Sequence, residues 1–250
     1  MKLAVVPLLL ASQLAAATSI LNIPQSIFSN PEDSSTNVHR IPTVRESAAM
    51  ARKILRLEKI GTLSTSFPIS KHDGVNANEN RPASVEGMPF GLMDYYADCE
   101  PTTGNPTLLA LTIESSFKNV VAGSNITLSV RWHPSYHHPY SAAAHPRFAM
   151  VGTLEDITDE EAQAAHVKAC FSKYHPDSVV WQPGNRIHEA RWVRFVTKEI
   201  YWLGGFGDRA YIGWIPLETW QDITEEEIKN AHLDGEKKHF WDKWFGNYEL

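Results

Sequence analysis

Apolar and polar residues alternate with a period of two along several short stretches of the chain, and this period predicts half-buried strands. The alternation is clearest in residues 125–132, where the side chains expected to face inward are large and apolar: Ile126, Leu128, Val130 and Trp132. Six more strands are predicted at residues 61–67, 89–97, 107–113, 148–154, 191–203 and 210–215. Short strands interspersed with short helices predict a mainly β protein, a barrel with helical covers.

Three capping boxes predict where helices begin. In each box a threonine precedes a glutamate by three residues, and the two side chains satisfy backbone N–H groups of the first turn, at Thr43–Glu46, Thr158–Glu161 and Thr224–Glu227. The second helix is expected to continue to residue 174, because four residues share one helical stripe: Ala164, Val167, Phe171 and Tyr174. Pro176 then ends it, since a proline disfavours the α conformation in the residue before it.

The N-terminal residues have the pattern of a secretory signal peptide, expected at 1–17. Lys2 precedes a short apolar run, and Ala15 to Ala17 supply the small residues of a cleavage site. A buried N-terminal helix is the alternative. Residues 18–42 are expected to form an extended or disordered arm. The rest of the chain divides into a barrel domain, 43–224, and a C-terminal helical tail, 225–250.

Charge and hydrophobicity narrow the classes of partner. The chain has 250 residues and a net charge of −6, whereas nucleic-acid binding requires a basic surface, so no nucleic-acid partner is expected. The apolar run near the N-terminus is shorter than the roughly 20 residues that cross a bilayer. No later stretch is more apolar, so no membrane span is expected.

Two further observations agree with passage through an oxidising lumen. Asn125-Ile126-Thr127 is an N-glycosylation sequon at the start of a predicted strand, and Asn125 is a candidate for glycosylation where that end is exposed. Cys99 and Cys170 are the two cysteines of the chain. They allow one disulfide in such a compartment, or they are two separate buried thiols.

Candidate ligand-binding residues are few, and each has a structural alternative. Four histidines in a proline-containing loop allow a metal site or, given their irregular spacing, a solvated loop: His133, His137, His138 and His145. The Gly204–Gly207 turn allows close approach of a ligand or only connects two strands. No serine-hydrolase, zinc-protease or nucleotide-binding motif occurs in the sequence.

Ser115, Ser116 and Lys118 lie at the start of a short helix predicted at 115–121. Free backbone N–H groups, two hydroxyls and one ammonium group would together hold an anion. The alternative is an ordinary helix start with a surface lysine. Phe117 occupies a place where a second cation would help.

Aromatic residues recur at near-helical spacing close to the C-terminus, with lysines around them: Phe240, Trp241, Trp244 and Phe245. Such a segment suits a partner groove or a membrane surface. It also suits an end helix that docks on the barrel.

Several segments, taken in order, resemble a known family. They are Gly-Thr-Leu-Ser-Thr at 61–65, Met-Pro-Phe-Gly at 88–91, Phe-Ala-Met-Val-Gly-Thr-Leu-Glu-Asp-Ile-Thr at 148–158, His-Pro-Asp-Ser at 175–178 and Trp-Leu-Gly-Gly-Phe-Gly at 202–207. Over 43–224 the chain resembles the CREG-like proteins, a secreted branch of the pyridoxamine 5'-phosphate oxidase-like, FMN-binding split-barrel superfamily. The resemblance implies a six-stranded antiparallel split β-barrel, a homodimer, and a glycoprotein of the secretory or endolysosomal route.

The same resemblance implies where an FMN phosphate would bind and why binding should be weak. The matching positions are 88–91 and 115–118, so Ser115, Ser116 and Lys118 would form the phosphate seat. Met88 stands where flavin-binding members often have arginine, and Phe117 precedes the lysine. Each missing cation removes a charge-assisted hydrogen bond, on the order of 1.5–3 kcal/mol. No cofactor is therefore expected, and FMN is the candidate if one binds.

Three functions follow from these expectations. The first is a secreted or lumenal, non-catalytic glycoprotein that acts through protein contacts, such as a receptor partner, or through glycan-dependent sorting. The alternative is an FMN-dependent oxidoreductase with its cofactor at a dimer interface. The third is a haem-binding relative, because the glycine-rich turn at 203–210 resembles one in haem-utilisation split barrels.

Overall fold

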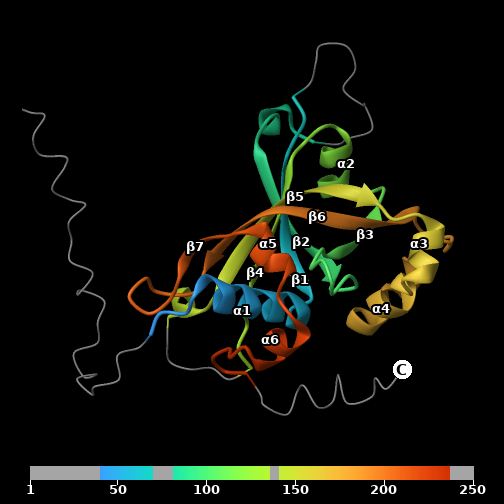
Figure 1. The fold of residues 1–250 in the computed structure, drawn as a ribbon. Helices are drawn as coiled ribbons and strands as arrows, with labels where there is room; N and C mark the ends of the chain where they lie inside the picture. The colour runs from blue at the N-terminus through green and yellow to red at the C-terminus, as the bar shows by residue number, and fades with distance from the viewer. Residues whose placement is uncertain (1–39, 70–80, 136–140, 237–250) are drawn as a thin grey trace, which may run out of the picture. The chain divides into compact units, whose positions relative to one another are not determined.

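The computed structural model describes residues 40–69, 81–135 and 141–236, and Figure 1 shows their arrangement. The helices are α1 (Val44–Leu57), α2 (Ser115–Val121), α3 (Asp159–Ala164), α4 (Val167–Tyr174), α5 (Leu217–Gln221) and α6 (Glu225–Asn230). The strands are β1 (Ile60–Ser66), β2 (Pro89–Ala97), β3 (Thr107–Leu111), β4 (Ile126–Arg131), β5 (Arg147–Asp156), β6 (Ala190–Leu203) and β7 (Ile212–Ile215). The expected signal peptide, His137, His138 and the aromatic segment 240–245 lie outside the described residues.

Six antiparallel strands close into a barrel. The strand order is β3-β2-β1-β4-β5-β6-β7, and β3 also pairs with β6, which joins the two sides of the sheet. The seventh strand, β7, pairs with β6 over four residues and lies outside the closed ring. The expected six-stranded antiparallel split barrel with helical covers is therefore confirmed, with β7 as an addition.

The interior of the barrel follows the period of two that the sequence shows. The inward-facing residues predicted for β4 are all buried, together with Trp132 directly after the strand. Phe148 and Met150 of β5 and Trp202 of β6 join them in the main core. At Gly152 the β5–β6 register shifts by one residue, and an added Cβ there would lie 2.3 Å from the Val196 carbonyl oxygen. The glycine is therefore needed for the two strands to approach at this bulge.

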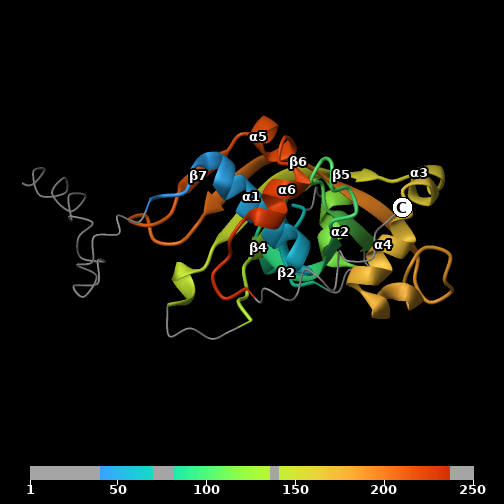
Figure 2. The ribbon, with the colours of Figure 1, turned by 60° about the horizontal axis from the view of Figure 1, so that its bottom comes forward.

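Helix α1 covers one end of the barrel together with the C-terminal elements α5 and α6, as Figure 2 shows. The capping boxes predicted at the starts of α1, α3 and α6 are confirmed, with both reciprocal hydrogen bonds present in each. Trp220, Ile228 and Leu233 from the C-terminal elements are buried in the main core beside Ile54 and Leu55 of α1. The core thus extends beyond residue 224 to residue 233.

Ion pairs attach the C-terminal elements to α1. Lys53 lies 2.9 Å from the Glu236 carboxylate, and both side chains are largely buried, at 3% and 11% exposure. Arg45 contacts Asp222 and Glu227 on the exposed side of the same helix. Because cationic residues of α1 meet carboxylates of residues 222–236, charge as well as apolar burial holds this cover in place.

The second cover differs from the single helix predicted for 158–174. His166 has a left-handed conformation with φ 51°, so that α3 ends before it and α4 begins after it. Ala164 is exposed, whereas Val167 and Phe171 are buried in a separate cluster on the outside of β2, β3 and β6. The predicted stripe was wrong, because the alanine-rich first half has little apolar surface to bury and a break lets α4 pack independently.

Two strand boundaries also differ from the expected ones. The third strand ends at Leu111 and not at residue 113, because the Glu114 amide bonds back to the Leu111 carbonyl and turns the chain into α2. The last strand begins at Ile212 rather than at residue 210. Within the described ranges, no helix is long and apolar enough to cross a membrane.

Candidate functional site

The predicted phosphate seat lies at the start of α2, a seven-residue helix that packs against β1 and β2. Ser115 is exposed, Ser116 and Phe117 are buried, and Lys118 is half-buried. Asn119, one turn along, donates a 3.0 Å hydrogen bond to the Thr65 hydroxyl and fixes the helix to β1. The three seat residues therefore all differ in accessibility, and Phe117 takes part in the barrel core.

Two carboxyl groups occupy the approach to this helix. Glu114 is the N-cap residue of α2, and its side chain forms a hydrogen bond with Asp94 of β2. Burial, followed by repulsion from Asp94, raises the pKa of Glu114 to about 8. Burial also raises the pKa of Asp94, against a 2.7 Å hydrogen bond that its carboxylate accepts from the Tyr95 amide. At neutral pH the pair therefore shares a proton and retains negative charge.

These residues do not fit an FMN phosphate. A dianionic phosphate needs several donors that converge on it, and the start of α2 presents one lysine beside a carboxyl pair. Met88, which stands at the second implied phosphate position, is 54% exposed and offers no charge. The Glu114 side chain makes no capping hydrogen bond to the helix and pairs with Asp94 instead, so the two carboxyl groups place negative charge where an anionic ligand would bind.

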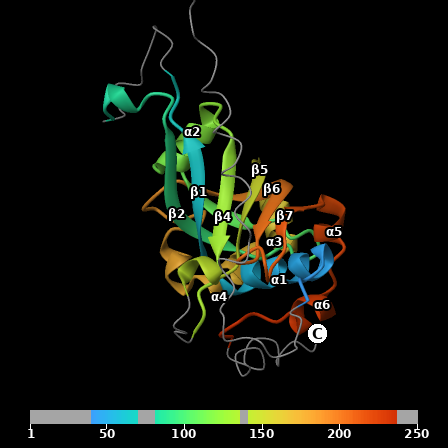
Figure 3. The same ribbon diagram turned by 90° about the vertical axis from the view of Figure 1, so that its left-hand side faces the viewer.

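A different surface of the barrel is open. Outward-facing residues of six neighbouring strands form one cross-strand row, here called the open face: Met93, Thr62, Ser129, Ala149, Tyr201 and Trp214. Successive residues of this row are paired in register, and from Thr62 to Trp214 each has at least one chain neighbour in the main core. Figure 3 views this side, with β2, β1 and β4 in front.

The open face has small side chains in its middle and large side chains at its two edges. Thr62, Ser129 and Ala149 form the floor, while Met93 is 71% exposed on one side and Trp214 is 55% exposed on the other. Tyr201 meets Trp214 edge to face, with ring centroids 5.1 Å apart. A groove of about 540 Å³ crosses the sheet from Met93 to Tyr201, and Trp214 stands beyond its lining. Exposed tryptophan, tyrosine and methionine side chains are enriched in protein interfaces.

Basic residues line one end of this groove. Arg147 donates hydrogen bonds to the carbonyls of Ala143 and His145, so its guanidinium also supports the turn before β5. His133 lies 3.0 Å from Glu58, the residue that follows α1. No hydrogen bond or ion pair links the Arg131 guanidinium to another residue in the described parts of the chain. This cation is therefore available to a partner of the groove.

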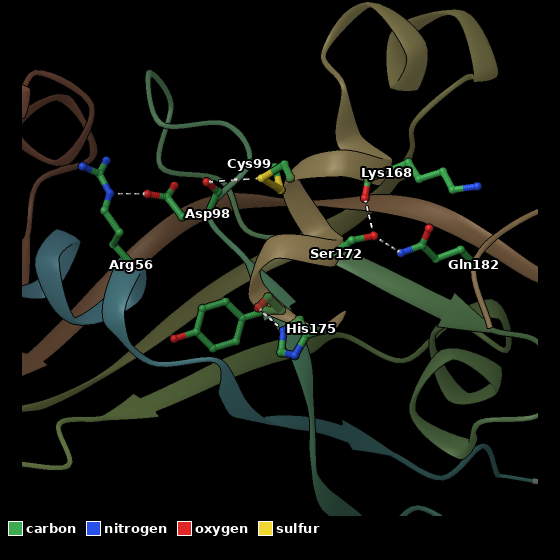
Figure 4. Close-up of a disulfide and its surroundings, with 9 residues drawn as sticks. Arg56, Asp98, Cys99, Lys168, Ser172, His175 and Gln182 are labelled. Atoms are coloured by element: carbon green, nitrogen blue, oxygen red, sulfur yellow. Dashed lines mark hydrogen bonds and ion pairs between the residues drawn. A yellow bond between two sulfur atoms is a disulfide. The ribbon is translucent and has the colours of Figure 1, made fainter. Parts of the chain in front are cut away.

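Cys99 and Cys170 form a disulfide, with their Cα atoms 5.9 Å apart. It joins the end of β2 to α4, as Figure 4 shows, next to the buried ion pair of Arg56 with Asp98. His175, which follows α4, donates from Nε2 to the Tyr96 carbonyl at 2.8 Å and stacks on Tyr95. Burial lowers the pKa of His175, so the ring stays neutral and structural.

The other sequence candidates lie apart from one another. Asn125 is exposed immediately before β4, a position that an oligosaccharide can reach. No cluster of three or more metal-ligating residues occurs in the ranges that the structure describes, and His133 there pairs with Glu58 instead. The Gly204–Gly207 segment makes the connection between β6 and β7, and the Gly204 amide bonds to the Tyr211 carbonyl.

Sequence reasoning missed two features of this region. Glu114 directly precedes the predicted seat, so an acidic N-cap beside Ser115 was a visible signal against an anion site. The open face had no comparable signal, because its residues come from separate strands and only the register places them in one row.

Comparison with known proteins supports the fold and identifies the family of this chain. One solved protein aligns over 72% of this chain and 99% of its own length, at 16% identity and a TM-score of 0.52. A heme binding protein from Mycobacterium smegmatis aligns over 73% of this chain and 61% of its own, at 19% identity and a TM-score of 0.47. A protein of unknown function from Agrobacterium tumefaciens, Atu2129, aligns over 76% and 63%, at 17% identity and 0.47. This chain therefore spans less than two thirds of the length of these last two proteins.

At such identities the likeness concerns the fold alone. No curated protein sequence matches this chain. A family model described as "CREG, beta-barrel" matches residues 42–222, which include all seven strands and helices α1 to α5. With the sequence segments and the closed six-stranded barrel in agreement, the chain belongs to the CREG beta-barrel family.

Proposed function

We propose that this protein is a non-catalytic member of its family, which acts through protein contacts on the open face and does not use a flavin. The observation that carries the proposal is the Asp94–Glu114 pair at the start of α2. A carboxyl pair repels the phosphate that anchors FMN, while the exposed Met93, Tyr201 and Trp214 suit a protein partner.

The spectrum of the purified protein tests the first half of the proposal. Protein prepared without added cofactor should be colourless, and titration with FMN should leave the flavin fluorescence unquenched. A yellow protein that keeps its colour through dialysis would establish the alternative, an FMN-dependent oxidoreductase. In that case Lys118→Ala should weaken FMN binding by about tenfold or more, since one charge-assisted hydrogen bond is lost. A haem-type absorbance would favour the third candidate.

Self-association is the simplest contact for the open face. A second copy packed on this face would bury the row from Met93 to Trp214 in a symmetric interface. We propose a homodimer formed in this way. Ala149→Asp places a charge on the groove floor and should shift the native mass toward the monomer, whereas Ala164→Asp on exposed α3 should not. Equal masses for both variants at all concentrations would exclude the open face as the dimer interface.

The proposed compartment is secreted or lumenal, along the secretory or endolysosomal route. An exposed sequon at Asn125 and the Cys99–Cys170 disulfide are both compatible with that route. Expression in a eukaryotic secretory host tests it. The protein should appear outside the cell or in a lumenal fraction, and Asn125→Gln should remove the mobility shift that a glycosidase removes from the unmodified protein.

A further inference from the structure

We infer that a second copy docks on the open face about a two-fold axis through Ala149, so that Glu199 of each copy pairs with Arg131 of the other. The inference rests on the homodimer proposed above. It goes further by naming the side chains that fix the orientation of the two copies, so that the cationic site on each copy is complete only when the other is present.

The two charges lie on opposite sides of Ala149, which is in the central row of the open face. Arg131 lies two residues after Ser129 on β4, and Glu199 lies two residues before Tyr201 on β6. Alternate residues of a strand point to the same side, so both charged side chains belong to the open face. Strand β5 lies between β4 and β6. Each charge is therefore one strand spacing, about 4.8 Å, and two residues, about 6.8 Å, from Ala149, in opposite directions.

A two-fold axis perpendicular to the face at Ala149 exchanges these two positions. Because β4 and β6 both run antiparallel to β5, the rotation carries Glu199 of one copy over Arg131 of the other. In a symmetric two-fold interface every contact occurs twice. A single arrangement therefore makes two ion pairs and leaves neither charge of either copy facing an uncharged surface.

Neither charge is engaged within its own chain. Arg131 and Glu199 are both exposed, and among residues 40–69, 81–135 and 141–236 no ion pair or side-chain hydrogen bond joins either of them to another residue. Arg131 also lies directly opposite Arg147 in the β4–β5 ladder. Like charges directly opposite each other in a sheet are destabilising. A carboxylate from the second copy would relieve this repulsion.

The shapes of the two copies match about the same axis. Tyr201 and Trp214 follow Ala149 in the row, on β6 and β7, and are large. Ser129 and Thr62 precede it, on β4 and β1, and form the groove floor. The rotation places Tyr201 of one copy over Ser129 of the other, and Trp214 over Thr62. Aromatic side chains thereby enter the groove of the other copy, and the small Ala149 at the axis lets the two sheets approach.

This distribution of charge favours a second copy over an unrelated protein. The face carries cations on one side of its central row, at Arg131 and Arg147, and an anion on the other side, at Glu199. A uniformly acidic or basic partner would meet a charge of its own sign on one of the two sides. A second copy related by the two-fold axis meets the opposite sign at Arg131 and at Glu199.

Charge reversal in the full chain tests the inference, with the dimer dissociation constant read from the native mass over a range of concentrations. Glu199→Arg brings like charges together at both contacts and should raise the dissociation constant about tenfold or more. Arg131→Glu should raise it similarly. The controls Glu189→Arg and Arg186→Glu make the same two changes of net charge at exposed positions before β6, away from the open face, and should leave it unchanged.

Mixing the two variants separates charge pairing from a general loss of packing. In a mixed dimer of Glu199→Arg with Arg131→Glu, each contact again joins a carboxylate to a guanidinium. The mixed dimer should therefore form well above the share that random pairing gives. One chain that carries both substitutions should dimerise about as tightly as the unmodified protein.

The outcomes distinguish this inference from the proposed homodimer. If the unmodified protein is a dimer and Glu199→Arg and Arg131→Glu dimerise equally well, the inference fails while the homodimer stands. If both variants dissociate and their mixture does not recover, these two side chains do not contact each other, and the inference also fails. A native mass of one chain for the unmodified protein at every concentration would remove the homodimer and the inference together.

Discussion

At the scale of single residues, the protonation of Glu114 at the start of α2 makes the stability of the fold depend on pH. Its pKa is raised to about 8 in the folded protein, mainly by burial and by Asp94. A group whose folded pKa is raised stabilises the fold while it is protonated, and the contribution is lost as pH rises. The relevant window runs from the unfolded value of 4.5 to about 8. The fold should therefore be more stable in acid than in mild alkali, as far as this residue is concerned.

We expect the melting temperature to fall by a few degrees between pH 5 and pH 8, corresponding to about 1–2 kcal/mol after allowance for partial solvent exposure. Glu114→Gln should remove most of this slope, and Glu189→Gln, an exposed position, should leave it unchanged. Calorimetry across the pH range measures both. A slope that persists in Glu114→Gln would show that this carboxyl is not the titrating group.

Buried and exposed ion pairs of α1 should also differ in how much they contribute to the free energy of unfolding. Lys53→Met removes the ammonium group that pairs with the largely buried Glu236 carboxylate, and we expect it to lower the free energy of unfolding by about 3–5 kcal/mol. Adding Glu236→Gln should restore part of that loss. Arg45→Met, at the exposed pairs with Asp222 and Glu227, should lower it far less, because solvent screens these pairs. Denaturant unfolding of these variants measures the three values.

At the scale of elements, the disulfide matters most for α4, which lies outside the barrel on its own small cluster. Cys99 and Cys170 are 71 residues apart in the sequence, and a loop of that length corresponds to about 4 kcal/mol of stabilisation. Beside this bond, Val167 and Phe171 pack in the apolar cluster on those strands, so the position of the helix depends on both.

Replacement of both cysteines by alanine should lower the melting temperature by roughly 10 °C, at about 2–4 °C per kcal/mol. Reducing agent should lower that of the unmodified protein similarly and should not affect the double variant. A double variant as stable as the unmodified protein would mean that apolar packing alone holds α4.

At the scale of the whole molecule, the core does not end where the family match ends. The match stops at residue 222, whereas Ile223, Ile228 and Leu233 are buried in the main core. Each such side chain contributes about 2–5 kcal/mol, and the net stability of a domain is about 5–15 kcal/mol. The elements after residue 222 are therefore part of the folding unit.

A chain that stops after Asp222 should accordingly fail to fold, while one that stops after Glu236 should fold cooperatively. Near-ultraviolet circular dichroism, which reports the packing of Trp220 and its neighbours, distinguishes the two outcomes. Equal spectra from both chains would show that the barrel is complete without α6.

The sequence predicted those parts of the fold that depend on local pattern. Strand β4 was predicted because its apolar residues alternate strictly, and the starts of α1, α3 and α6 because each carries a Thr-x-x-Glu box. The break at His166 was not predicted, since nothing in its local sequence requires a left-handed residue. The open face could not be predicted either, because the row from Met93 to Trp214 exists only after the register of six strands is known.

The brevity of β7 has a consequence for how copies of this molecule can meet. It is the last strand of the sheet, and in the described residues only β6 pairs with it. A strand from another molecule added to its outer edge would gain at most a four-residue ladder of main-chain hydrogen bonds. Gly213 within β7 weakens this ladder further. Such an attachment is too weak to propagate, so fibre-like growth from this edge is discouraged and encounters between copies depend on side chains.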